Sequence, residues 1–288
     1  MNTDITVIIL TKNEETNIER CVLSAKKVAE KIFVVDSGSN DKTVEIAKKL
    51  GCDVVNHEFV SYAHQYIWAL DNLQITTTWI FRLDADEIVT DKLAEEIKKE
   101  CSIHSTDDIN GFIVSFKIRF LGKVLKRAAL YPFLNLVIWK RGKGNYSERF
   151  MGEHVVLTEG KTITLKNYCE HDDTKSLDVW VKKHNWYSTR EVVDYYARNG
   201  KNETKQNIYQ NAKKTQKMRD GFYYRLPLFF RARLYFWYRY ILKLGFIDGI
   251  PGKIYCWLQA YWYRFLVDAK IYECEHTSIK YKDPGDLK

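Results

Sequence analysis

The sequence is poor in proline, in closely spaced cysteines and in long apolar runs. Four prolines and 14 glycines in 288 residues exclude a collagen-like or low-complexity chain. The six cysteines form no CxxC pair, which excludes a cysteine zinc site or a disulfide scaffold and is typical of a reducing compartment. There is no run of about 18 apolar residues, and the first residues lack the basic and apolar regions of a signal peptide. We therefore expect neither a membrane-spanning helix nor a secreted chain.

The composition is that of a folded protein whose positive charge is concentrated near one end. Hydrophobic residues make up 45% of the chain and charged residues 28%, which is enough to build a core. The formal net charge is +8, and residues 211–270 contain 12 Lys or Arg against three Asp. Of the 41 aromatic residues, 18 lie between Phe222 and Tyr272. The sequence predicts a neutral body followed by a basic, aromatic C-terminal part.

Short apolar runs alternate with amphipathic stretches over the first hundred residues. Strands that alternate with helices of this length indicate right-handed crossovers and a mainly parallel sheet. Ligands bind such sheets at the carboxyl ends of the strands. The expected strands are Ile5–Leu10, Ile32–Val35, Val54–Val55 and Trp79–Leu83, and the expected helices are Asn13–Val28, Asp41–Leu50, Tyr62–Leu73 and Asp91–Lys99.

From residue 111 the pattern changes to strands separated by polar turns that contain glycine. Helical periodicity returns at about Leu177, so we expect a boundary near residues 170–176. The expected strands of this part are Gly111–Phe120, Asn135–Trp139, Val155–Thr158 and Thr162–Leu165.

Polar clusters follow three of the predicted strands: Thr11–Glu14, Asp36–Asp41 and Asp84–Glu87. Because the carboxyl ends of parallel strands share one edge, we expect the three clusters to lie together. The third cluster holds three carboxylates in four residues, and their mutual repulsion favours a bound Mg²⁺ or Mn²⁺. A solvated acidic turn is the alternative for this cluster.

The first two clusters also suit a purely structural role. Thr11 or Asn13 could be the N-cap of the helix that follows. Asn40 or Asp41 could cap the next helix from a turn. These alternatives stay open at the level of the sequence.

Six segments of the chain resemble one protein family. VIILTKNEE, FVVDSGSNDKT and WIFRLDADE, in this order, resemble the nucleotide-sugar-binding half of family 2 glycosyltransferases with a GT-A fold. LYPFLNLVIWKRGKG, HDDTKSLDVWVKKHNWYS and GFIDGIPG are similar to a branch that includes lipopolysaccharide-core glucosyltransferases. The resemblance implies an α/β, Rossmann-like GT-A fold, with helices on both faces of a mainly parallel sheet. A helical C-terminal region that associates with membranes is expected from the composition of that part of the chain. The implied catalytic domain covers residues 1–172, with 1–100 for the nucleotide-sugar and 101–172 for the acceptor, and the C-terminal region covers 173–288.

The resemblance also implies roles at the donor site. Asp86 matches the metal ligand of the DxD motif, and Asp84 would hold the ribose or the same Mn²⁺ or Mg²⁺. That cation would neutralise charge on the leaving nucleoside diphosphate. Asp36 would hydrogen-bond a uracil-like base, so a UDP-sugar is the expected donor. The other donor-side residues are Thr11, Asn13 and Glu14 around the base and ribose, and Ser37 and Gly38, whose backbone the base would approach.

The implied reaction is an inverting single displacement, which needs a general base on the acceptor hydroxyl and no enzyme nucleophile. Relatives in this branch often carry a His-Glu pair here, whereas Phe150–His154 has the order Glu-His. Since a shift of one residue moves a strand side chain to the opposite face, the order matters. We expect Glu153 to be the base and His154 to be either a neighbour of it or a contact to the acceptor or the metal. In the acceptor-side strand, Val137 stands at the position where relatives of this branch usually have arginine. His171, further along the chain, is either structural or an extra ligand for metal or diphosphate.

Residues 222–246 and 253–270 mix aromatic and basic side chains too finely for a membrane span. Aromatic rings and long basic side chains together favour a membrane interface. We expect helices that lie on an anionic membrane surface. The alternatives are packing of these aromatics on the catalytic domain or in a dimer interface.

The expected function is that of a bacterial glycosyltransferase on the cytoplasmic face of the cell membrane, as a peripheral protein. Its acceptor would be a lipid-linked glycan or a lipopolysaccharide or polysaccharide, and the enzyme would build a surface polysaccharide or lipopolysaccharide. The main alternative is a nucleic-acid-binding protein that uses the basic aromatic segment, although the acidic cluster makes nucleic acid an unexpected partner. A nucleotidyltransferase would need a glycine-rich loop, and Thr11–Glu15 contains no glycine. The Asp84 and Asp86 pair disfavours a non-catalytic sugar-nucleotide binder.

Overall fold

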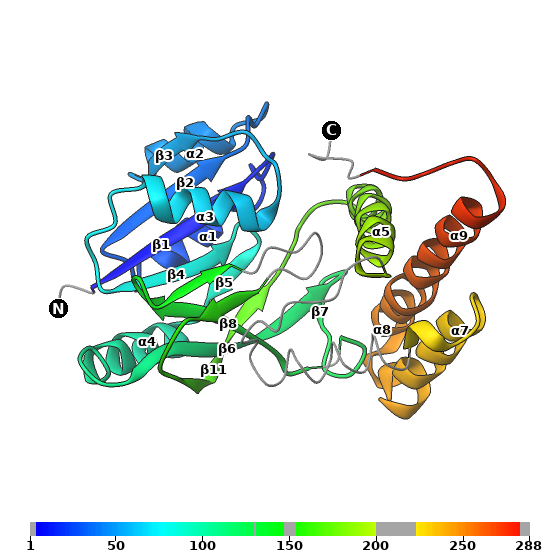
Figure 1. Ribbon diagram of the computed structural model, residues 1–288. Helices are drawn as coiled ribbons and strands as arrows, with labels where there is room; N and C mark the ends of the chain where they lie inside the picture. The colour runs from blue at the N-terminus through cyan, green and yellow to red at the C-terminus, as the bar shows by residue number, and fades with distance from the viewer. Residues whose placement is uncertain (1–3, 130, 147–153, 200–222, 283–288) are drawn as a thin grey trace. The chain divides into compact units, whose positions relative to one another are not determined.

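The computed structural model describes residues 4–129, 131–146, 154–199 and 223–282. The chain divides into two compact units, whose elements are coloured by position in the chain in Figure 1. The first unit comprises Met1–Arg119, Pro132–Glu148 and His154–Thr174, and the second comprises Phe120–Tyr131, Arg149–Glu153 and Lys175–Lys288.

A mixed sheet forms the centre of the first unit. Its strands, in spatial order, are β3 (Asp53–Asn56), β2 (Lys31–Asp36), β1 (Ile5–Thr11), β4 (Trp79–Asp84), β8 (Phe133–Lys140), β6 (Ile109–Phe120), β11 (Lys161–His171) and β5 (Glu87–Val89). The first four strands are parallel, as predicted, and β8 is antiparallel to both of its neighbours. β11 runs parallel to β6 and antiparallel to β5. A separate antiparallel pair joins β9 (Gly144–Tyr146) and β10 (Val155–Leu157).

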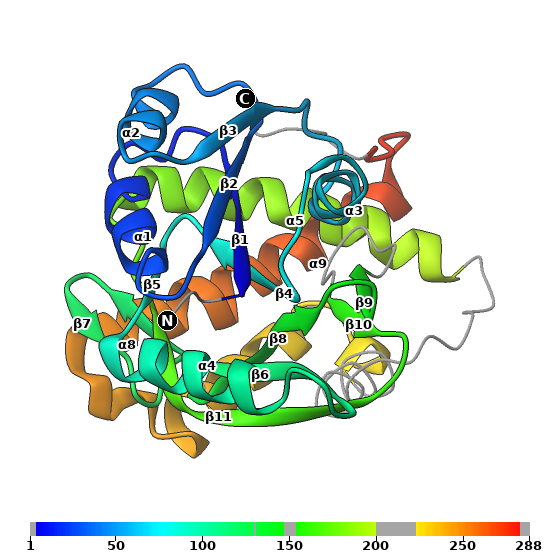
Figure 2. The same ribbon diagram turned by 90° about the vertical axis from the view of Figure 1, so that its left-hand side faces the viewer.

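Helices cover both faces of the parallel strands. In Figure 2, α1 (Ile18–Ala25) and α2 (Thr43–Lys49) lie on one face and α3 (Tyr62–Asn72) lies on the other. α4 (Asp91–Ile103) packs against β11. Every residue of β1 except Leu10 is buried. A strand covered on both faces explains the nearly continuous apolar run in the sequence.

Two local features differ from the expectation based on sequence. The helix expected from Asn13 begins only at Ile18, and Asn13 itself has a left-handed φ of 55°, which excludes it from a right-handed helix. The short strand β5 was not expected, since three residues after an acidic turn carry no strand periodicity. Pairing of β5 with β11 places the end of β11 beside the acidic cluster.

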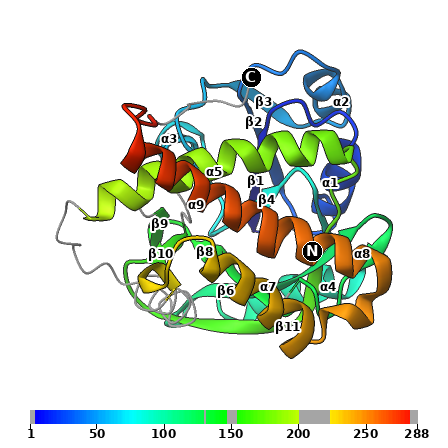
Figure 3. The same cartoon turned by 90° about the vertical axis from the view of Figure 1, so that its right-hand side faces the viewer.

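The second unit is largely helical, which confirms the expected helical C-terminal region. α5 (Leu177–Asn199) packs against α9 (Tyr263–His276), as Figure 3 shows. Val192, Val267 and Ile271 lie in the hydrophobic cluster of this unit. Its elements are β7 (Lys123–Val124), α5 (Leu177–Asn199), the 3₁₀ turn η1 (Tyr223–Arg225), α7 (Phe230–Trp237), the π-helical turn η2 (Tyr238–Leu242), the 3₁₀ turn η3 (Gly245–Asp248), α8 (Gly249–Tyr255), the π-helical turn η4 (Cys256–Trp262) and α9 (Tyr263–His276).

Some basic residues of the segments expected at a membrane surface are instead buried inside this unit. The Arg231 and Asp268 side chains form an ion pair at 2.5 Å, and each is 1% exposed. Arg264 pairs with Glu191 at 2.5 Å. Buried charges need such partners, so these arginines serve the fold. Among the residues that the structure describes, no helix is long and apolar enough to cross a membrane.

Candidate functional site

The polar clusters after β1, β2 and β4 lie at one edge of the sheet, as predicted. The register pairs Thr11 with Asp36 and Leu10 with Asp84. The Thr11 hydroxyl donates to Asp36 Oδ1 over 2.8 Å. Parallel pairing of these three strands therefore brings together residues that lie far apart in the sequence.

The Asp36 carboxylate holds the loop that follows β2. Oδ1 accepts from the hydroxyls of Thr11 and Ser39 at 2.8 and 2.5 Å, and Oδ2 accepts from the backbone N–H groups of Gly38 and Ser39 at 2.9 and 2.8 Å. Gly38 has a φ of 80°, which glycine adopts without strain. Asp36 is 1% exposed, so its carboxylate is committed to the loop. The resemblance implies a direct bond from Asp36 to a base, whereas this carboxylate already accepts four hydrogen bonds within the protein.

Lys12 and Asn13 connect the loop after β1 to the loop after β2. Lys12 Nζ donates to the carbonyl oxygens of Ser37 and Gly38, each at 2.8 Å. The Asn13 backbone N–H donates to Ser39 Oγ at 2.8 Å. The residues predicted around the base thus form one hydrogen-bonded network. We call the two loops that it joins, Thr11–Glu14 and Asp36–Ser39, the rim.

The capping role considered for Thr11 and Asn13 is wrong, because α1 begins after Asn17. Glu14 lies just before this helix, where its side chain accepts from Asn17 Nδ2 at 3.0 Å. Its backbone N–H donates to Thr43 Oγ1 at 2.8 Å. Glu14 therefore keeps a fixed position at the rim.

The capping role considered for Asn40 or Asp41 is not confirmed, because the N-cap of α2 is Lys42, which makes no side-chain capping bond. Asp41 Oδ1 accepts the backbone N–H of Thr43 at 3.0 Å, at the start of α2. Asp41 Oδ2 accepts the backbone N–H of Glu15 at 3.1 Å. Asp41 thus adds one more link between the two loops.

The acidic cluster lies where β4 turns into β5. Arg82 forms an ion pair with Asp84 Oδ2, while Asp84 Oδ1 is buried without a hydrogen-bond partner among the described residues. Asp86 is 7% exposed and Glu87 is 4% exposed. Burial raises the pKa of Glu87 well above its ordinary value, and the charge of Asp84 raises it further. This concentration of buried carboxylates favours a cation.

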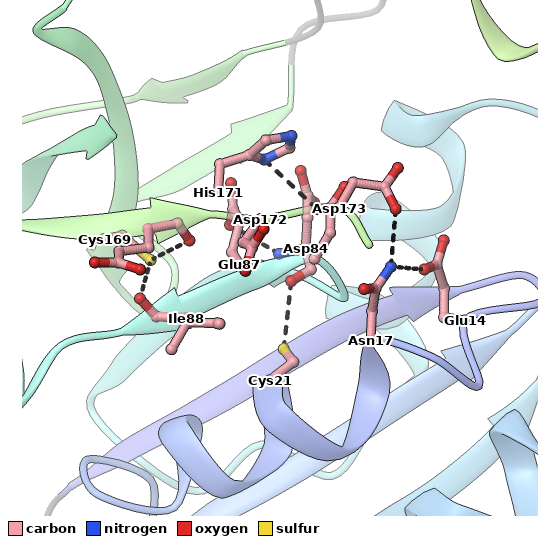
Figure 4. Close-up of polar contacts among 12 residues, drawn as sticks. Glu14, Asn17, Cys21, Asp84, Glu87, Ile88, Cys169, His171, Asp172 and Asp173 are labelled. Carbon is pink, nitrogen blue, oxygen red and sulfur yellow. Dashed lines mark hydrogen bonds and ion pairs between the residues drawn. The ribbon is translucent and has the colours of Figure 1, made fainter. Parts of the chain in front are cut away.

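The end of β11 adds His171 to this cluster. The register pairs His171 with Glu87, and His171 Nδ1 lies 3.6 Å from Asp86 Oδ1. Figure 4 shows His171, Asp84 and Glu87 close together at this edge. The sequence alone left His171 between a structural and a ligand role, because its neighbour β5 was not predicted.

Asp172 and Asp173 fasten the end of β11 to the start of α1. Arg20 Nη1 lies 2.8 Å from Asp172 Oδ2. Asn17 Nδ2 donates to Asp173 Oδ1 at 3.0 Å as well as to Glu14, and Figure 4 shows this bridge. These contacts fix His171 relative to the rim.

The side chains that could bind a divalent cation here are those of Asp84, Asp86 and His171. Carboxylate oxygens suit Mg²⁺ and Mn²⁺, and the unpartnered Asp84 Oδ1 provides an acceptor. Within the described ranges, no group of three or more His, Cys, Asp or Glu side chains could hold a metal ion by itself. Proteins commonly hold Mg²⁺ through one or two carboxylates plus substrate phosphates, and these residues fit that arrangement.

Two residues of α3 were missed by sequence reasoning. Gln65 is fully buried, and its Nε2 donates to Ser37 Oγ at 2.7 Å and to the His57 carbonyl at 3.0 Å. Tyr66 stacks on Tyr146 with ring centroids 4.6 Å apart. In the sequence, both positions look like ordinary members of an amphipathic helix. The one signal in the sequence is the polar Gln65 on the face of the helix that the apolar residues bury.

The acceptor side is only partly described. The expected general base, Glu153, lies outside the described residues. His154 lies directly before β10 and is half-buried. Val137 is fully buried in β8, so the position that usually carries arginine contributes to the core in this chain.

Comparison with known proteins identifies the family. Glycosyl transferase family 2 matches residues 6–158, which is more than half of the chain. An uncharacterized glycosyltransferase of Rickettsia typhi is 28% identical over 200 residues, covering 66% of this chain and 67% of its own length. A similar protein of Rickettsia conorii is 29% identical over 203 residues, covering 66% of this chain and 70% of its own length.

A solved structure shares the fold. The mannosyltransferase PcManGT of Pyrobaculum calidifontis matches with a TM-score of 0.55 at 15% identity, over 95% of this chain and 88% of its own. This likeness confirms the predicted GT-A type of α/β fold, whereas no comparison confirms the lipopolysaccharide-core branch. The match over residues 6–158 covers the rim and the acidic cluster. The chain belongs to glycosyl transferase family 2 and is a glycosyltransferase.

Proposed function

We propose that the chain transfers a sugar from a nucleotide-sugar to a glycan acceptor by an inverting, metal-dependent single displacement. The observation that carries this proposal is the meeting of Asp84, Asp86 and His171 beside the hydrogen-bonded rim of Thr11 and Asp36. The acidic residues would receive the diphosphate with its cation. The rim would receive the base and ribose.

The expected donor is a UDP-sugar, on the resemblance of the Asp36 loop. The two loops present Ser37 Oγ, the backbone around Gly38 and the Glu14 side chain at the rim. PcManGT was solved in complex with GDP-Man and Mn²⁺, so a guanine nucleotide is the alternative to test. Because the Asp36 carboxylate is filled by four donors, we infer that it acts on the base through the loop that it holds.

Asp86 and Asp84 would hold Mn²⁺ or Mg²⁺ together with the phosphates of the donor, and His171 would contact the diphosphate or the metal. The bound cation would supply neutralising charge to the leaving diphosphate. Arg82 keeps the Asp84 carboxylate oriented through their ion pair. Glu87 supports the same turn by accepting the backbone N–H of Asp84 at 2.9 Å.

On the acceptor side we propose Glu153 as the general base, with His154 next to it. A positioned carboxylate would take the proton of the acceptor hydroxyl as the new glycosidic bond forms. The proposed acceptor is a lipid-linked glycan of a bacterial lipopolysaccharide or polysaccharide, at the inner face of the cell membrane.

Release of nucleoside diphosphate from a panel of sugar nucleotides tests this proposal. We expect release from UDP-sugars in the presence of Mn²⁺, and loss of release with EDTA or in Asp86→Asn. Asp91→Asn is the matched control, since Asp91 lies five residues further along with a side chain that is 84% exposed. Release from GDP-sugars alone would show that the donor is a GDP-sugar and not a UDP-sugar. Turnover of Asp86→Asn equal to that of the control would contradict the metal site.

A further inference from the structure

Large apolar side chains are exposed around η3 of the second unit. Leu242 is 73% exposed, Ile247 is 58% exposed and Ile250 is 74% exposed. Leu244 and Phe246 between them are 39% and 46% exposed. We call these five side chains the apolar tip.

The backbone next to the apolar tip is closely packed. The Asp248 carboxylate is buried and accepts three backbone N–H groups of Lys126–Ala128, at 3.1, 2.8 and 2.7 Å. A Cβ atom at Gly252 would lie only 2.6 Å from the Gly245 carbonyl oxygen, so the chain segments are in close contact. The backbone that carries the exposed apolar side chains is therefore held in place by close packing and by the Asp248 hydrogen bonds.

Aromatic rings continue this surface along α7 and η4. Phe246 contacts Tyr240 with centroids 6.2 Å apart, Tyr240 contacts Phe236 at 5.4 Å, and Phe236 contacts Trp257 at 5.9 Å. Trp257 is 52% exposed and Trp237 is 56% exposed. Tryptophan and tyrosine rings are favoured at the interface between lipid and water.

The charge on this surface has one sign. Lys243 lies within the tip and Lys253 lies on α8, and both are exposed. The acidic residues from η1 to the start of α9 are Asp248 and Asp268, which are 2% and 0% exposed. The described part of this segment therefore presents exposed lysines and no exposed carboxylate.

We propose that the apolar tip inserts into the headgroup region of an anionic lipid bilayer, with Lys243 and Lys253 on the lipid phosphates. A bilayer accepts projecting apolar side chains and aromatic rings without a complementary shape, and anionic lipids match the unbalanced charge. A second copy in a symmetric dimer would bring the same lysines face to face, which disfavours that occupant. The inference does not depend on the donor site.

Flotation of the full chain with lipid vesicles tests this inference. We expect binding to vesicles that contain phosphatidylglycerol, and weaker binding to phosphatidylcholine alone. Leu242→Ser with Ile250→Ser should lower the partition coefficient about 10- to 100-fold. Lys243→Glu with Lys253→Glu should lower it about tenfold or more on anionic vesicles and change it little on neutral ones.

The matched control is Leu23→Ser with Ile103→Ser, which removes apolar side chains of the first unit that are 49% and 56% exposed. This control should bind like the wild type, and circular dichroism should show that all variants are folded. Failure of the wild type to bind either vesicle would overturn the inference. So would conversion of a dimer to a monomer by the tip variant without vesicle binding, or binding of a labelled oligonucleotide in place of vesicles.

Discussion

The buried Asp36 carboxylate gives a prediction that separates a structural role from direct contact with the base. Replacement by alanine would remove the acceptor of four hydrogen bonds that hold the loop after β2. Two of the donors are hydroxyls of Thr11 and Ser39, which can rotate toward other acceptors. The other two are backbone N–H groups of Gly38 and Ser39, which cannot.

The magnitude follows from these donors. A buried N–H group left without a partner costs about 1–3 kcal/mol, and these two groups are partly buried, so Asp36→Ala should destabilise the first unit by up to about 2–6 kcal/mol. Asp36→Asn keeps an amide oxygen for the two N–H groups, and its NH₂ group can donate to the Thr11 hydroxyl. We expect Asp36→Asn to cost about 1 kcal/mol, mainly through loss of the charge.

Thermal unfolding and UDP titration of the two variants measure both effects. A loss of 1 kcal/mol lowers Tm by about 2–4 °C for domains of this size, so the variants should differ clearly in Tm. UDP affinity should fall with loop stability, strongly in Asp36→Ala and by less than about tenfold in Asp36→Asn. An Asp36→Ala protein with unchanged Tm and abolished UDP binding would refute this reasoning and show that the carboxylate contacts the base directly.

Three further predictions concern the strained turns, a buried lysine and the acceptor side. Gly160→Ala should lower Tm by more than Gly51→Ala, because both glycines have positive φ but a Cβ at Gly160 would lie 2.7 Å from the Asp108 carbonyl oxygen, whereas Gly51 has nothing within 4 Å. Burial lowers the pKa of Lys270 from 10.5 to about 8. The stability of the wild type relative to Lys270→Met should therefore rise by up to about 1.4 kcal/mol per pH unit between these values in urea unfolding, and a flat difference would contradict the shift. Glu153→Gln should lower kcat about 10²- to 10⁴-fold in the transfer assay with donor binding retained, and wild-type turnover would move the base elsewhere.

The carboxyl-end rim could be predicted because it depends on strand order alone. Once β1, β2 and β4 are parallel neighbours, Thr11, Asp36 and Asp84 must lie at one edge. The same argument could not place His171. Its position depends on the short strand β5, and such a short strand leaves no periodic signal.

The sequence also could not predict which helical side chains point into the protein. Arg231 and Arg264 count as positive charge in the sequence, yet each is neutralised by a carboxylate within its own unit. Gln65 reads as one polar residue in an amphipathic helix, and only tertiary packing shows that it donates to Ser37. These ion pairs and buried hydrogen bonds join residues that lie far apart in the sequence, so no local sequence pattern predicts them.

The central claim is that the acidic cluster binds a cation together with a nucleoside diphosphate. Calorimetric titration of UDP with Mn²⁺ and with EDTA, on the wild type, Asp86→Ala and the exposed control Asp91→Ala, tests it most directly. We expect binding that requires Mn²⁺ in the wild type and the control, and loss of that binding in Asp86→Ala. UDP binding of equal strength with EDTA, or in Asp86→Ala, would contradict the account.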